Sequence, residues 1–171
     1  MRLFLALVPP PALRGRLGEL ADLAHARCGG RRVPDESLHL TLAFLGEVEA
    51  APAAALADWL RDLTIASGTW RLDAWGRFPR PGIVWVGGHH PDPALQALQR
   101  WLWDDLERLG HPGRPSRFVP HVTLLRRARR LDSRDLPDIC LEWSYHHIEL
   151  IHSIVDDRGA RYVPLARSNE Q

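Results

Sequence analysis

Lysine is absent from this sequence, and asparagine and methionine each occur once. All 22 basic residues are therefore arginine, and 21 acidic residues balance them to a net charge of +1. The chain as a whole is not a polycation, and we interpret the missing lysine as the mark of a genome that avoids A-rich codons. Cys28 and Cys140 form no metal-binding spacing. We expect them to be buried or half-buried free thiols in a reducing compartment, without a catalytic role.

A long apolar run is also missing. None approaches the roughly 18–20 residues that span a bilayer, and the apolar run 3–8 ends at three prolines with no cleavage site of small residues after it. We therefore expect a first strand rather than a signal peptide, and a cytoplasmic protein without membrane contact. With 171 residues, 45% of them apolar and 25% charged, one domain over 1–171 is the simplest organisation, and we expect a monomer.

Apolar periodicity predicts both helices and strands. Residues 92–109 give the clearest helix, because Asp92 can cap it, Pro93 suits its first turn and leucines recur at helical spacing. Residues 69–78 and 82–88 flank Pro-Arg-Pro and predict a hairpin. The other expected elements are strands at 3–8, 37–46 and 118–126, helices at 13–24 and 51–63, and a closing hairpin of 145–155 and 161–167.

The tripeptide His-x-Thr occurs twice, in "LHLTLAFLG" at 38–46 and in "PHVTLLRRA" at 120–128. With nine histidines and four threonines, chance predicts about 0.2 such tripeptides. Residues i and i+2 of a strand share a face, so His39 and His121 each lie beside a threonine while the intervening apolar residues face the core. A purely structural role, in which the histidine and threonine are half-buried strand residues with satisfied side chains, would be an adequate explanation of a single motif. It is a poor explanation of two motifs in matching strands. One copy in each strand–helix–strand half suggests an internal duplication.

Two imidazoles with two hydroxyls suit in-line displacement at a phosphodiester. Unperturbed histidine has a pKa near 6.5, so one neutral imidazole can accept a proton from water while a protonated one donates to the leaving oxygen. Threonine hydroxyls can donate to the non-bridging oxygens, where negative charge needs stabilising. This chemistry requires neither a metal nor a cofactor.

Other catalytic groups are weaker candidates. Adjacent histidines, as in "GHHP" at 88–91 and "YHHIELIH" at 145–152, point to opposite faces of a strand and rarely chelate one ion together. No H-E-x-x-H spacing accompanies them, and the sequence has no G-x-S-x-G elbow and no glycine-rich phosphate loop. Metal catalysis and a nucleophilic serine or cysteine are therefore disfavoured.

Arginine is concentrated in two places. Arg27, Arg31 and Arg32 precede the first motif, and five arginines between 126 and 134 directly follow the second. Such clusters are usually solvated surface, but guanidinium groups are also a common means of holding phosphate. The clusters are therefore compatible with an anionic substrate without requiring one.

These residues give the sequence a resemblance to a known family, the bacterial and archaeal RNA 2',3'-cyclic phosphodiesterases, also called the 2'-5' RNA ligase family, within the two-histidine phosphoesterase superfamily. The similarity extends from about residue 1 to 167, and "VPDES" differs only slightly from the usual Pro-Glu-Asn wording. It implies a bilobed α+β fold with two antiparallel sheets backed by helices, a pseudo-twofold duplication and a central active-site cleft. The matching segments are "MRLFLALVPP", "VPDESLHLTLAFLGEV", "GRFPRPGIVWVGG" and "RFVPHVTLLRRAR".

The resemblance also implies roles for individual residues. His39 and His121 would be catalytic, with His121 activating water and His39 protonating the departing ribose 3'-oxygen to leave a 2'-phosphate. Thr41 and Thr123 would bind the phosphate. Arg126 stands where an arginine commonly follows the second motif, but strand alternation points it away from His121 unless a bulge or the strand's end turns it.

Phe44 has the parity of a core residue, so packing is its expected role, although at the rim of a strand it can stack a nucleobase. The implied partners are nucleotides and RNA with a 2',3'-cyclic phosphate end or a 2'-5' linkage, with no metal, and weak reversible 2'-5' ligation is a further implied activity. Two alternatives stay open. One is an RNA-end binding module that uses the arginine clusters, and the other is a phosphodiesterase for a small cyclic nucleotide, with substrate choice made by loops such as 111–118.

Overall fold

The protein consists of three α-helices and ten β-strands within residues 1–130 and 133–170, which the computed structural model describes. The helices are α1 (Pro11–Cys28), α2 (Ala50–Arg61) and α3 (Pro93–Arg108), with short 3-10 turns η1 (Asp35–Ser37) and η2 (Ser133–Asp135). The strands are β1 (Arg2–Leu7), β2 (Arg31–Arg32), β3 (Leu40–Glu47), β4 (Gly68–Leu72), β5 (Ala74–Phe78), β6 (Ile83–Gly87), β7 (Val122–Arg126), β8 (Leu141–Tyr145), β9 (Glu149–Asp156) and β10 (Gly159–Arg167).

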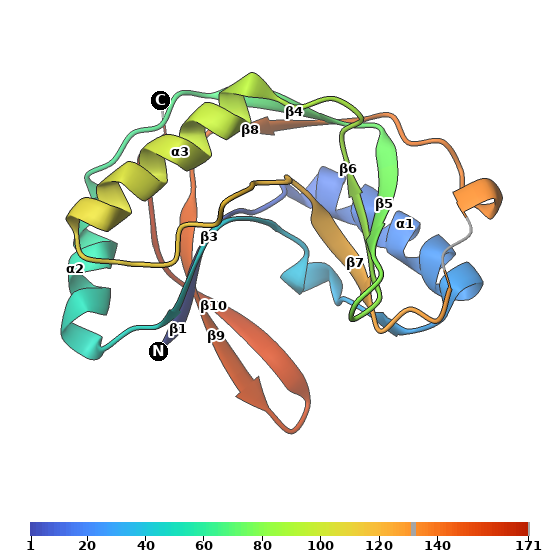
Figure 1. Ribbon diagram of the computed structural model, residues 1–171, viewed down its shortest axis with the longest axis horizontal. Helices are drawn as coiled ribbons and strands as arrows, with labels where there is room; N and C mark the ends of the chain where they lie inside the picture. Colours follow the sequence, from blue (N-terminus) through green and yellow to red (C-terminus); the bar gives the residue numbers. More distant parts are fainter. Residues whose placement is uncertain (131–132, 171) are drawn as a thin grey trace.

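The strands form two antiparallel sheets, which confirms the α+β class. The larger sheet has eight strands in the order β10-β9-β1-β3-β7-β6-β5, with β2 against β7, and the smaller sheet is β4 with β8. At the centre of the larger sheet, β3 and β7 are joined through one residue pair, Leu40 with Val122. The strands diverge from that pair, so the sheet separates into a first lobe (β10, β9, β1, β3) and a second lobe (β7, β6, β5, β2), as Figure 1 shows.

The helices cover the two lobes in a crossed arrangement. Helices α2 and α3 pack on the first lobe, against β10 and β3, whereas α1 packs on β7 of the second lobe (Figure 1). Because α1 follows β1 of the first lobe in the chain, the polypeptide crosses between the lobes repeatedly. The two strand–helix–strand halves read from the sequence are therefore interleaved, and each half contributes elements to both lobes.

One apolar core extends through both lobes and includes side chains from all three helices. Its largest fully buried side chains are three tryptophans, Trp70, Trp103 and Trp143. Trp70 and Trp143 are cross-strand partners in the small sheet, with ring centroids 5.8 Å apart. Burial of a large apolar side chain stabilises the fold by about 1.5–3 kcal/mol, so these two rings help to hold the small sheet to the body.

Most of the expected elements are confirmed, with shifted ends. Helix α3 begins as predicted, because Asp92 Oδ1 accepts a hydrogen bond from the backbone N–H of Leu95 at 3.0 Å. The strand expected at 69–78 is wrong: the chain divides at Asp73, so that β4 pairs with β8 and β5 pairs with β6. The Asp73 N–H donates to the Gly87 carbonyl, and its carboxylate accepts from the His89 N–H, which fixes this break. Strands β8 and β2 were not expected.

The cysteines and the apolar helices can be placed directly. Cys28 is buried at the end of α1, as expected, whereas Cys140 is exposed, so the expectation of a buried or half-buried residue is wrong there. Within residues 1–130 and 133–170, no helix combines the length and the apolar composition needed to cross a membrane.

Gly76 of β5 provides a test of the packing of the second lobe. A Cβ at this position would overlap the ring of Trp85, its cross-strand partner. We expect Gly76→Ala to lower the free energy of unfolding by about 1–3 kcal/mol, because overpacking forces a side chain off its rotamer. Urea unfolding measures this. Gly15→Ala is the control, since its Cβ meets open space on helix α1 and should stabilise by up to about 1 kcal/mol. Equal stability of the Gly76→Ala and wild-type proteins would contradict the packing described.

Candidate active site

The two His-x-Thr motifs meet at the single pair that joins the lobes. Leu40 pairs with Val122, and each of these residues lies between the histidine and the threonine of its motif. In the antiparallel register that this pair sets, Thr41 stands opposite His121 and Thr123 opposite His39. Side chains opposite one another share a face of the sheet, so the four polar groups form one cluster around the junction.

The histidines lie one residue before their strands, not within them as the sequence suggested. His39 Nδ1 donates to the Ser37 carbonyl at 2.7 Å, and His121 Nδ1 donates to the Val119 carbonyl at the same distance. The 3-10 turn η1 ends at Ser37, and Pro120 has no N–H to offer a ladder, so neither strand extends further back. Each imidazole is thus tethered to the carbonyl two residues earlier.

This tether fixes the tautomer of both imidazoles. A carbonyl can only accept, so Nδ1 carries the proton and Nε2 of the neutral ring is an acceptor. His39 Nε2 accepts from the Thr41 hydroxyl at 2.8 Å. Within the described part of the chain, His121 Nε2 has no hydrogen-bond partner, and it is the nitrogen available to a ligand.

A β-bulge follows each threonine and changes which residues face the cluster. Along β3, Leu42 has no partner on β1, because Ala6 pairs with Thr41 and Leu5 with Ala43. Along β7, the register shift against β6 has the same form: Trp85 pairs with Thr123 and Val84 with Leu125, which leaves Leu124 unpaired. Both strands consequently share the burial order buried, intermediate, buried, buried, exposed.

The bulges place Phe44 and Arg126 at equivalent positions, on the face of the sheet that carries the motif histidines and threonines. The bulge turns Arg126 to the same face as the histidines, as the sequence required for it to approach them. Its positive charge lowers the pKa of both imidazoles. For Phe44 the expected core parity is wrong: the side chain is 49% exposed, with the Arg2 guanidinium 4.9 Å from its ring centroid. Phe44 pairs with Phe4 across β1 and β3, so it lies on the same face as the motif residues.

Two aromatic rings enclose each histidine, an arrangement that sequence reasoning missed. The His39 ring lies 4.9 Å from Phe4 and 5.4 Å from Tyr162, measured between centroids. The His121 ring lies 5.1 Å from Phe78 and 5.8 Å from Trp85. Phe4 and Tyr162 come from β1 and β10, and Phe78 and Trp85 from β5 and β6. The predicted hairpins contain three of these rings, but no local pattern indicated that the hairpins lie against the motifs.

The aromatic surroundings favour the neutral form of both imidazoles, because burial lowers the pKa of each. Burial lowers the pKa of His39 to about 4; the hydrogen bond to the Ser37 carbonyl opposes this shift, and the charges of Arg126 and His121 add to it. Burial also lowers the pKa of His121, again opposed by its carbonyl partner and aided by Arg126. A bound anion would counter the charge of Arg126 and raise both pKa values. The cluster is thus electrostatically prepared for an anionic ligand.

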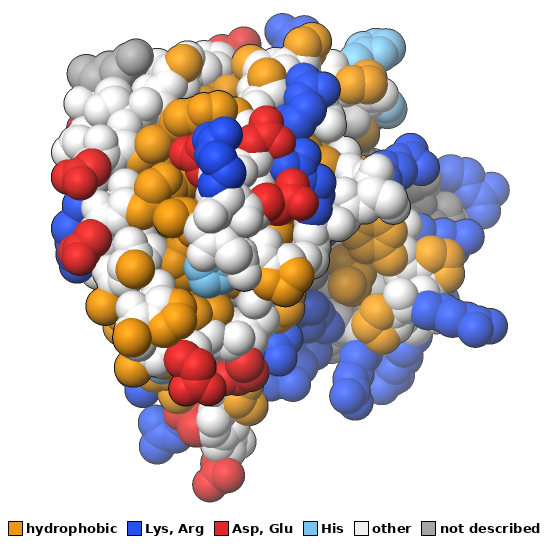
Figure 2. Space-filling model, turned by 60° about the vertical axis from the view of Figure 1, so that its left-hand side comes forward, with side chains coloured by type: hydrophobic (Ala, Val, Ile, Leu, Met, Phe, Trp, Pro, Cys, Tyr) orange, Lys and Arg blue, Asp and Glu red, His pale blue; other side chains and the backbone are white. Residues whose placement is uncertain are grey.

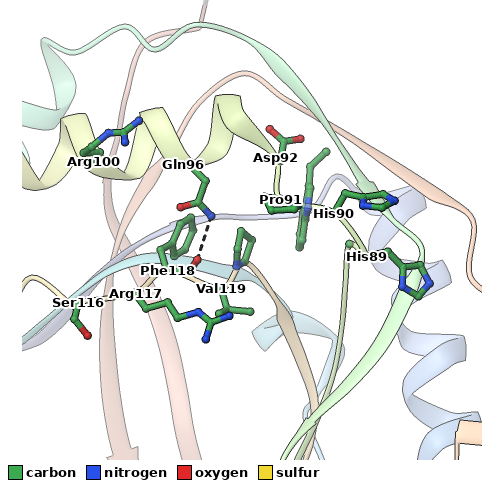
Figure 3. Close-up of a pocket in the computed structure, with 13 residues that line it drawn as sticks. His89, His90, Pro91, Asp92, Gln96, Arg100, Ser116, Arg117, Phe118 and Val119 are labelled. Atoms are coloured by element: carbon green, nitrogen blue, oxygen red, sulfur yellow. Dashed lines mark hydrogen bonds between the residues drawn. The ribbon is translucent and has the colours of Figure 1, made fainter.

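A cavity of about 610 Å³ lies between the start of α3 and the segment 116–120. Figure 3 shows Gln96 of α3 donating to the Phe118 carbonyl, at 3.1 Å, with Arg117 on the same segment. None of the four motif residues lines it. Its wall includes Val119, which directly follows the loop 111–118 and whose carbonyl holds His121.

His146 and His147 contact residues outside this cluster. His147 lies between Glu149 at 3.3 Å and Glu170 at 3.2 Å, and His146 contacts the Ser67 hydroxyl. Among the residues that the structure describes, no group of three histidine, cysteine or acidic side chains is arranged to hold a metal ion. The functional groups that the cluster itself presents are imidazole, hydroxyl and guanidinium groups.

The fold and the cluster together define an α+β protein of two lobes with a repeated His–Thr site at their junction. Residues 9–157 match the model of the 2'-5' RNA ligase superfamily. The chain belongs to this superfamily, as the resemblance predicted.

Similar proteins match from about seven tenths to nearly all of the chain. The RNA 2',3'-cyclic phosphodiesterase of Escherichia coli (strain K12) is 35% identical over 170 residues, which cover 97% of this chain and 94% of that protein. That of Aeropyrum pernix is 35% identical over 127 residues, or 72% and 70% of the two chains. The crystal structure of E. coli LigT complexed with 3'-AMP superposes with a TM-score of 0.84 at 32% identity, covering 97% of this chain and 95% of that one. A crystal structure from Thermus thermophilus gives 0.77 at 30%, covering 98% and 97%.

The influence of Arg126 on the imidazoles can be measured directly. Arg126→Gln removes a positive charge that disfavours both imidazolium ions, so we expect the pKa of His39 to rise above about 4 and that of His121 to rise with it. Titration of the imidazole Cε1–H signals by NMR gives both values. Arg127→Gln is the control, because the neighbouring charge does not contribute to either shift. Unchanged values in Arg126→Gln would place the guanidinium away from the site.

Proposed function

We propose that this protein hydrolyses RNA 2',3'-cyclic phosphate ends to 2'-phosphates, with His39 and His121 as general acid and general base. The observation that carries the proposal is the symmetric cluster, in which both imidazoles have the same tether, the same tautomer and a threonine opposite. The curated bacterial and archaeal relatives named RNA 2',3'-cyclic phosphodiesterase support the choice of substrate.

The reaction follows from placing the cyclic phosphorus between the two Nε2 atoms. His121 Nε2 accepts a proton from water as the water oxygen attacks phosphorus. The bond from phosphorus to the ribose 3'-oxygen breaks, and protonated His39 gives its Nε2 proton to that oxygen, which leaves a 3'-hydroxyl and a 2'-phosphate. Thr41 and Thr123 donate to the non-bridging oxygens, and Arg126 offsets their charge. The tethers keep Nε2 of both rings directed to this position.

Metal independence is part of the proposal. Water activation, leaving-group protonation and charge stabilisation are each assigned to a side chain of the cluster, so no step requires a Lewis acid. Weak, reversible 2'-5' ligation is the same displacement with a 5'-hydroxyl in place of water: its oxygen attacks phosphorus, the bond to the 3'-oxygen breaks, and the same residues would transfer the protons. Phe44 is proposed as a stacking surface for the terminal base, because its exposed ring lies on the cluster's face.

Removal of either histidine tests the proposal. We expect His39→Ala and His121→Ala each to slow the conversion of a short RNA 2',3'-cyclic phosphate to the 2'-phosphate by about 10²–10⁴-fold, and the wild-type rate to persist in EDTA. Chromatography of the products distinguishes the two phosphate isomers. His146→Ala, an exposed histidine outside the cluster, should keep the wild-type rate. Wild-type rates from both cluster variants, or loss of activity in EDTA, would contradict the mechanism.

The lowered pKa values also predict the pH dependence. The competent free protein has one protonated and one neutral imidazole, and the population of this state peaks midway between the two pKa values. Because both values lie below 6.5, we expect kcat/KM to be highest below pH 6.5 and to fall as pH rises through 7 to 8. Arg126→Gln should move the maximum upward. A maximum above pH 7 in the wild-type protein would be incompatible with this assignment.

A further inference from the structure

A second cavity, of about 300 Å³, adjoins the histidine cluster on the side of the β9–β10 hairpin. It lies between this hairpin and the edge formed by β2 and β7, and Ser37, Arg126 and Tyr162 are common to its wall and to the surroundings of the histidines. The cavity thus directly adjoins the cluster, with these three residues between them.

Arginines dominate the polar part of this wall. Arg31 and Arg126 are cross-strand partners on β2 and β7, an arrangement of like charges that costs free energy unless an anion compensates it. Neither forms an ion pair with a carboxylate among the described residues. Arg32, the next residue, differs: it is bonded to Asp22 at 2.6 Å and Asp35 at 2.7 Å. The protein thus neutralises Arg32 internally and leaves Arg31 and Arg126 available.

A third guanidinium approaches from the hairpin. Arg158 lies at the turn between β9 and β10, where its N–H donates to Asp156 Oδ1 at 2.8 Å, and it lines the cavity. Arg31 reaches across to the same turn: a Cβ on Gly159, which has φ of +107°, would lie 2.6 Å from Arg31 Nη2. Figure 2 shows basic side chains gathered to the right of the hairpin that projects at the bottom of the view.

The same wall also has an apolar part. Val155 of β9 is 72% exposed, and it lines the cavity together with Ala160 and Tyr162. An inorganic anion would make no favourable contact with these apolar side chains. A nucleotide carries both a phosphate for the arginines and a flat base that can pack on the apolar part. The volume is at the lower end of the roughly 300–1,000 Å³ range of ligand sites. The neighbouring cavity at the β5–β6 turn, of about 120 Å³, is smaller than that range.

We propose that this cavity binds the second nucleotide from the cyclic end of an RNA chain, with Arg31 and Arg158 holding the phosphate that links the last two nucleotides. Its base lies against Val155. The inference rests on the proposed function, because it takes the cyclic phosphate to be at the histidine cluster. It makes the substrate an oligonucleotide, which the enzyme distinguishes from a cyclic mononucleotide by this site.

Comparison of two substrates tests the inference. The variants Arg31→Gln, Arg158→Gln and their double are assayed on a hexanucleotide RNA with a 2',3'-cyclic end and on adenosine 2',3'-cyclic monophosphate. We expect kcat/KM for the RNA to fall roughly tenfold for each arginine and the mononucleotide rate to stay within about twofold. The slope of log KM for the RNA against log salt should weaken by about 0.7 for each arginine removed. The mononucleotide rate also reports that the variants are folded.

Arg129→Gln is the matched control, since Arg129 lines the smaller cavity at the β5–β6 turn. It should leave both substrates unaffected. A loss of RNA activity in Arg129→Gln but not in Arg31→Gln or Arg158→Gln would overturn the inference, and so would equal losses on RNA and mononucleotide.

A binding measurement separates failure of this inference from failure of the proposed function. Fluorescence anisotropy of a 5'-labelled RNA with the cyclic end is followed with His121→Ala protein, with and without the arginine substitutions. Weaker RNA binding on loss of Arg31 and Arg158 supports the site even if the wild-type protein hydrolyses neither substrate. An RNA affinity that is unchanged by the Arg31 and Arg158 substitutions would contradict the proposed binding site, even if the wild-type protein hydrolyses the RNA.

Discussion

The pairing of Leu40 with Val122 organises the whole molecule. It joins two lobes that otherwise diverge, and both of its residues are fully buried. Antiparallel pairing then brings each histidine opposite the threonine of the other motif. A slip of one residue would turn every side chain to the opposite face and would separate the four polar groups. The core that extends through both lobes holds this register, so the geometry of the site is a consequence of packing elsewhere.

The bulges at Leu42 and Leu124 add a second constraint. A bulge inserts one residue without a partner and reverses the alternation of side chains between the two faces of the sheet after it. Two neighbouring apolar side chains therefore face the core, and the next side chain lies on the face that carries the motif residues. The first lobe thereby presents Phe44 and the second Arg126, an aromatic ring and a cation at matching positions. The two lobes thus share the bulged strand but present different side chains on it, which suits the asymmetric ligand of the proposed function, with its base and its phosphate.

Electrostatics explain why the cluster is poised for an anion. Aromatic rings remove water from both imidazoles, and Arg126 adds a positive charge nearby, so the free protein disfavours the imidazolium that acid catalysis needs. In the proposed mechanism, the negative charge of the bound phosphodiester relieves this conflict. Arg31 pairs with Arg126 across β2 and β7. It therefore extends the uncompensated positive charge from the histidine cluster into the neighbouring cavity. The arginine clusters of the sequence therefore divide into internally neutralised residues, such as Arg32, and residues left available at the surface.

Local spacing and residue type were enough to predict the repeated motif and the capped helix α3, and the resemblance to the family implied the α+β class. They also identified Arg126 as a residue that needs a bulge to approach the histidines. Spacing and residue type could not predict three features: the interleaving of the halves, the break at Asp73 and the exposure of Phe44. All three depend on which strands become neighbours and in what register they pair. The aromatic pairs around the histidines come from strands distant in the chain, so their effect on the pKa values arises only when the lobes are assembled.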